Sequence, residues 1–74
     1  MKFSYQIVSK PVCKELLIHS EDGDNYIKYK LKPEGYIISG LSEEMLYLCS
    51  REMIDRTYKT EDDIKKFVIR LNLA

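Results

Sequence analysis

Residues 16–30 have the sequence LLIHSEDGDNYIKYK, in which two alternating apolar and polar runs flank an Asp-Gly pair. A period of two is typical of strands in a sheet with one buried face. Asp22-Gly23 is a strong hairpin signal, because glycine adopts the positive φ of tight turns at little steric cost. The sequence therefore predicts two antiparallel strands joined at this turn.

The register of the hairpin depends on where the turn lies. A turn at Asp22-Gly23 places Ile18 opposite Ile27, whereas a turn at Gly23-Asp24 places Ile18 opposite Tyr29. Both registers keep the same residues on the inner face, because side chains alternate with a period of two. The inner face is therefore predicted in either case, and the register stays open between the two.

Strands on both sides extend this hairpin into a meander. Residues 2–8 read KFSYQIV and place Phe3, Tyr5 and Ile7 on one face, before Pro11 interrupts the ladder. A turn at residues 33–35 leads into a fourth apolar segment. The sequence predicts an antiparallel sheet of three to four strands over about residues 2–39.

The inward face of the fourth segment is ambiguous, because the length of the preceding loop is not determined by its residues. Either Ile37 faces inward, or Tyr36 and Ile38 do. We favour the pair.

After Gly40 the apolar period becomes that of a helix, and helices are predicted over about residues 42–56 and 60–73. Ser42 and Thr60 are suitable N-caps, because a hydroxyl accepts a hydrogen bond from a first-turn amide. The clearest core stripe lies in the second helix, at Ile64, Phe67, Val68 and Leu71. We therefore expect residues 1–74 to form one α+β domain, a β-meander followed by a two-helix hairpin packed on one sheet face.

Composition limits the partners and the compartment. Twelve basic and twelve acidic side chains balance among 74 residues, so no net field attracts the chain to nucleic acid or an anionic membrane. No apolar run approaches the roughly 18 residues of a membrane span. The chain starts without a long apolar run, and Cys13 and Cys49 are too far apart for a metal knuckle. We expect reduced cysteines, a cytoplasmic protein and no membrane partner.

The residues that enzymes use for chemistry are scarce. His19 is the only histidine and has no carboxylate fixed beside it by sequence, and the three glycines all lie at predicted turns. The acidic loop at residues 21–25 lacks the spaced carboxylates of a calcium loop. We therefore expect a non-enzymatic protein with no catalytic residue, cofactor or metal.

Apolar side chains at predicted exposed positions are the more informative feature. More of them project from the two helices than one layer of packing covers, namely Tyr47, Leu48, Ile54, Ile69 and Leu73. The leading hypothesis is a protein-binding module, a small regulator or inhibitor, that uses these five residues as its contact surface. The same surface would also suit a homodimer.

The alternative hypothesis is a protein that binds single-stranded nucleic acid. The outer face of the predicted sheet carries an aromatic side chain beside a basic stripe, formed by His19, Tyr26, Lys28, Lys30 and Lys32. Such faces stack bases and contact phosphates. Lysines on an exposed strand also serve solubility, which makes this alternative the weaker of the two.

Overall fold

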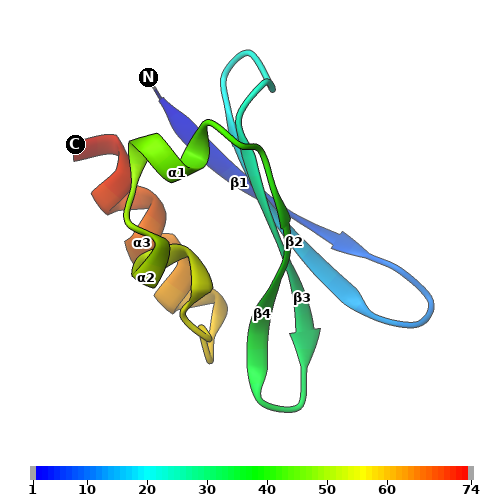
Figure 1. Ribbon diagram of the computed structural model, residues 1–74. Helices are drawn as coiled ribbons and strands as arrows, with labels where there is room; N and C mark the ends of the chain where they lie inside the picture. Colours follow the sequence, from blue (N-terminus) through cyan, green and yellow to red (C-terminus); the bar gives the residue numbers. More distant parts are fainter. Residues whose placement is uncertain (1, 74) are drawn as a thin grey trace.

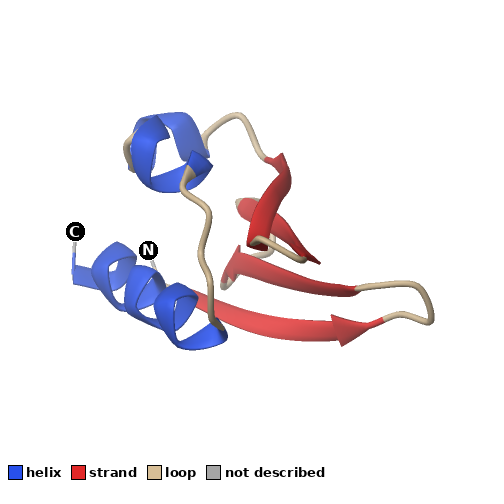
Figure 2. Ribbon diagram, turned by 90° about the horizontal axis from the view of Figure 1, so that it is seen from below, coloured by secondary structure: helices blue, strands red, loops and turns tan. Residues whose placement is uncertain are grey.

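Four strands form one antiparallel sheet in chain order, as described for residues 2–73 in a computed structural model (Figure 1). The strands are β1 (Phe3–Ser9), β2 (Lys14–Ser20), β3 (Tyr26–Lys32) and β4 (Gly35–Leu41). Three helices follow, α1 (Met45–Leu48), α2 (Arg51–Asp55) and α3 (Glu61–Leu73), and they lie on one side of the sheet (Figure 2). The predicted α+β fold, a meander followed by helices on one sheet face, is confirmed.

The β2–β3 hairpin adopts the register that a turn at Asp22-Gly23 predicts. Ile18 pairs with Ile27 and Leu16 pairs with Tyr29. Gly23 has a φ of 79°, the left-handed conformation that the turn requires. The alternative register, with Ile18 opposite Tyr29, is not adopted.

The core lies between the inner face of the sheet and the helices. Tyr36 is buried and Ile38 packs against the core, as we favoured for the fourth segment. The predicted stripe of α3 is buried at all four positions, Ile64, Phe67, Val68 and Leu71. Thr60 caps this helix, because its hydroxyl accepts a hydrogen bond from the Asp63 amide at 3.2 Å.

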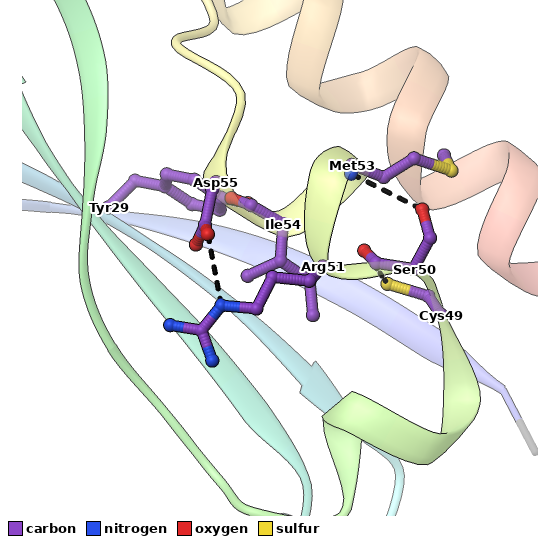
Figure 3. A network of polar contacts seen from close by, with 7 residues as sticks. All are labelled: Tyr29, Cys49, Ser50, Arg51, Met53, Ile54 and Asp55. Carbon is purple, nitrogen blue, oxygen red and sulfur yellow. Dashed lines mark hydrogen bonds and ion pairs between the residues drawn. The ribbon is translucent and has the colours of Figure 1, made fainter.

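The single helix predicted over residues 42–56 is two short helices. Cys49 is extended, with φ −151° and ψ 162°, and Ser50 then caps α2 by accepting from the Met53 amide at 3.3 Å (Figure 3). The predicted cap Ser42 has another role, because its hydroxyl accepts a hydrogen bond from the Tyr26 amide at 3.0 Å. Ser50 thus begins a second helix, α2, whose direction differs from that of α1 (Figure 3). Within residues 2–73, no helix combines the length and apolar character needed to cross a membrane.

Candidate functional site

A groove of about 510 Å³ lies between α2 and α3. The segment that connects these helices forms its floor, because Tyr58 exchanges two main-chain hydrogen bonds with Tyr36 on β4. The Tyr58 ring stacks on Phe67, with ring centroids 5.4 Å apart, and meets Tyr29 edge to face at 5.7 Å. The floor is therefore aromatic and fixed to the sheet.

The rim of this groove is basic. It carries four cationic side chains and one acidic side chain, namely Arg56, Lys59, Lys66, Arg70 and Asp63. Arg56 lies 3.9 Å from Glu52, and Lys66 lies 4.0 Å from Asp62; these are long, exposed pairs of the kind that contribute little. Within residues 2–73, Lys59 and Arg70 form no ion pair. The groove therefore has net positive charge above an aromatic floor.

A second, smaller depression of about 240 Å³ adjoins the first. Its lining is more apolar and includes Leu48, Cys49 and Leu71, and it shares Met53 and Arg70 with the basic groove. Met53 extends from α2 toward α3, where it lies between the two depressions (Figure 3). We call this continuous surface the helical groove; one end is apolar and the other is basic.

Cys49 belongs to the apolar end of the helical groove. Burial raises the pKa of its thiol. Its Sγ also lies 3.6 Å from the Ser50 carbonyl oxygen. A raised thiol pKa is the opposite of the lowered pKa that activates a nucleophilic cysteine.

The structure does not gather the five predicted contact residues into one patch. Tyr47 and Leu73 are largely exposed, and Leu48 and Ile69 are partly exposed. Of these, only Leu48 lines the helical groove. Ile69 and Leu73 lie one turn apart on the exposed side of α3, away from its buried stripe.

The prediction that Ile54 belongs to an exposed contact surface is wrong. Its side chain is fully buried, and its carbonyl oxygen accepts a hydrogen bond from the Tyr29 hydroxyl at 2.9 Å. The physical reason is the break at Cys49 and Ser50, which gives α2 its own direction and turns Ile54 toward the sheet. A continuous helix would have given a different inner face.

The outer face of the sheet brings together the residues of the nucleic-acid alternative. His19 and Tyr26 are cross-strand neighbours on β2 and β3, and the Lys28 Nζ lies 5.5 Å from the centroid of the Tyr26 ring. Lys30 and Lys32 continue along the same face of β3 and are exposed. The helices leave this face uncovered (Figure 2).

The basic rim of the helical groove was missed at the sequence level. Each of its side chains has the pattern of an ordinary solvated helix face or loop. A usable signal was the position of Lys66 and Arg70, four residues apart on one side of α3 next to the core residue Phe67. Among residues 2–73, no cluster of three or more His, Cys, Asp or Glu side chains is placed to hold a metal ion.

Comparisons with protein-family models, curated proteins and solved structures found no match to this chain.

Proposed function

We propose that this protein is a non-enzymatic protein-binding module, a small regulator or inhibitor, and that the helical groove is its contact surface. The observation that carries the proposal is the continuity of the groove. Met53 and Arg70 join an apolar end at Leu48 to a basic end at Arg56 and Lys59. A concave surface with an apolar part and a charged part suits a peptide segment of a partner protein.

The charges of the groove indicate the chemistry of this segment. Four cations against one acidic side chain favour a partner with carboxylates beside an apolar anchor. Such pairing gives a fast, salt-sensitive association, with the apolar end contributing affinity. Cys13 and Cys49 are free, which supports a reducing compartment such as the cytoplasm.

The test is a pull-down from the native cell in which both captured proteins and captured nucleic acids are identified. The test variant is Lys66→Glu/Arg70→Glu in the helical groove. The matched control is Lys28→Glu/Lys30→Glu on the outer sheet face, which changes the net charge equally. We expect the groove variant to lose the captured protein and the control to retain it. Equal retention by both variants, or loss in the control alone, would contradict the proposal.

The second candidate function is binding of single-stranded nucleic acid by the outer face. The observation that favours it is the juxtaposition of Lys28 and the Tyr26 ring beside His19, with two more lysines on the same strand. The test is titration of a labelled single-stranded oligonucleotide at low salt. This candidate predicts salt-dependent binding that is lost in Lys28→Glu/Lys30→Glu and kept in Lys66→Glu/Arg70→Glu. Absence of binding at low salt would eliminate it.

A further inference from the structure

Within residues 2–73, the outer edge of β1 is closed at its first residue, Phe3, and at no other. The Phe3 amide donates to Asn72 Oδ1 at 2.7 Å, and Asn72 Nδ2 donates to the Phe3 carbonyl at 3.0 Å. The side-chain amide of Asn72 thus occupies the position of a neighbouring strand at Phe3. Both main-chain groups of Phe3 therefore point away from β2.

The direction of the remaining main-chain groups follows from the antiparallel ladder, in which successive residues point alternately toward and away from the partner strand. Tyr5, Ile7 and Ser9 therefore point outward, as Phe3 does. The bond from the Lys10 amide to the Cys13 carbonyl, at 3.0 Å, confirms that the even-numbered residues point inward.

These three residues form an open edge. Within residues 2–73, no group forms a hydrogen bond with the outward amides and carbonyls of Tyr5, Ile7 and Ser9. In both ribbon views the far end of the β1–β2 hairpin extends beyond the helices (Figures 1 and 2). At Tyr5 the first turn of α3 is near, because the Tyr5 hydroxyl lies 3.5 Å from Glu61 Oε1, but this contact uses the side chain and leaves the Tyr5 main chain unbonded. An open edge of this kind is a template for another strand.

We propose that the occupant of this edge is a second copy of the same chain, paired antiparallel through β1 about a two-fold axis at Ile7. The open residues are arranged symmetrically about Ile7. Ile7 therefore pairs with Ile7 of the second copy, Tyr5 pairs with its Ser9, and Ser9 pairs with its Tyr5. Each of these three residue pairs exchanges two main-chain hydrogen bonds. The open stretch is therefore complementary to itself.

Both ends of the stretch stop where this pairing needs them to stop. At one end, the outward amide and carbonyl of Phe3 are already hydrogen-bonded to the side chain of Asn72. At the other end lies Pro11, which has no amide to donate. The paired length is thus set by the chain itself, and it is the same in both copies.

The side chains of β1 also suit a second copy. Residues 3–9, FSYQIVS, contain no charged residue, so antiparallel pairing brings no like charges into opposition. Edge strands that avoid pairing usually carry lysine, proline or a bulge, and β1 has none of these within its bounds. Pairing would cover Ile7, which is half-buried, and Val8, which is 39% exposed. The two sheets would become one, with the helices of both copies on the same face.

This inference goes beyond the proposed function, because the β1 edge shares no residue with the helical groove. The dimer leaves the groove of each copy free for a partner. Loss of dimerisation and loss of the captured protein are therefore separate results.

The first test measures mass by light scattering on a sizing column across a concentration series. Ser9→Pro removes an outward amide and leaves the internal bonds to β2 intact, which an edge position tolerates. Ser9→Ala is the matched control, because it keeps the amide. We expect the wild type and Ser9→Ala to dimerise and the dissociation constant of Ser9→Pro to rise at least about tenfold, since two intermolecular hydrogen bonds are lost. A wild-type monomer at several hundred micromolar, or an unchanged dimer in Ser9→Pro, would overturn the proposal.

The second test measures the register and does not depend on proline. In the proposed pairing Gln6 lies opposite Val8 of the second copy, in a non-hydrogen-bonded pair whose side chains are close. In a Cys13→Ser/Cys49→Ser background, Gln6→Cys and Val8→Cys are prepared as separate proteins. Mild oxidation of their mixture should give a covalent dimer, and neither protein should give one alone. Equal crosslinking of either protein with itself, or no crosslinking of the mixture, would overturn the Ile7-centred pairing.

Discussion

The two edges of the sheet are closed in different ways. On β4, Tyr36 exchanges two main-chain hydrogen bonds with Tyr58, at 2.6 and 3.1 Å, and the β3–β4 pairing shifts register between Lys28 and Tyr29. On β1, among the residues that the structure describes, the outward main-chain groups of Phe3 alone are bonded, by the side chain of Asn72. The β4 edge is therefore covered in part by the backbone at Tyr58, and its strand also carries a bulge. The β1 edge is covered at its start by the side-chain amide of Asn72.

The difference follows from how closely the backbone can approach each edge. Gly35 has a φ of 131°, and a Cβ at this position would lie 2.7 Å from the Tyr58 carbonyl oxygen. Only a glycine lets the α2–α3 connection approach β4 so closely. This approach also forms the floor of the helical groove. At β1, α3 reaches the first residue with a side chain, and the rest of the strand stays available for pairing.

The largest effect is expected from closing the space at Gly35. Gly35→Ala combines a backbone conformation that L residues rarely adopt with a clash against main-chain atoms of Tyr58 and Lys59. We expect the free energy of unfolding to fall by about 3 kcal/mol, measured from the midpoint of urea unfolding.

The matched control for Gly35 lies on the same strand. Gly40 has no positive φ and no atom within 4 Å of an added Cβ, so Gly40→Ala should change the free energy of unfolding by less than about 1 kcal/mol. Similar losses in the two variants would contradict the close approach of backbone at the β4 edge.

The next effect is a loss of stability at alkaline pH that originates on the β4 side. Burial raises the pKa of Tyr29, Tyr36 and Tyr58 above the ordinary tyrosine value. Above about pH 10 the unfolded chain releases these protons and the folded chain retains them. The contribution of these three tyrosines to the free energy of unfolding is therefore fully present below about pH 10 and falls above it. For Tyr29, which is fully buried, the slope is about 1.4 kcal/mol per pH unit.

Urea unfolding between pH 8 and pH 11.5 measures this slope. Tyr29→Phe should be less stable at pH 8, because it loses the hydrogen bond to the Ile54 carbonyl, and should lose less stability as the pH rises. A slope equal to that of the wild type would place the responsible tyrosines elsewhere.

The features that the sequence predicts correctly are those that local patterns determine. The Asp22-Gly23 turn and the alternation around it set the β2–β3 register within a few residues. The α3 stripe also repeats locally, and all four of its residues are buried. These features do not depend on any distant segment.

The missed features all depend on contacts between distant segments. Ser42 and Ser50 are both good caps by residue type. The Ser42 hydroxyl, however, accepts a hydrogen bond from the Tyr26 amide, 16 residues earlier in the chain, and does not cap a helix. That competition, together with the break at Cys49, places Ile54 in the core. The basic rim likewise exists only because α2 and α3 pack around Tyr58.

Asn72 shows the same dependence and gives the smallest predicted effect. In sequence it is a polar residue near a helix end, yet it binds a strand 69 residues away. Asn72→Ala removes two hydrogen bonds, while the higher helix propensity of alanine offsets roughly 0.5 kcal/mol. We expect a net loss of about 1 kcal/mol and faster hydrogen exchange at the Phe3 amide. Leu73→Ala, at the neighbouring exposed position, is the control and should leave that exchange rate unchanged. If the Phe3 amide exchanged at the wild-type rate in Asn72→Ala, the β1 edge would be protected by something other than this side chain, and the two edges would no longer differ in the way described.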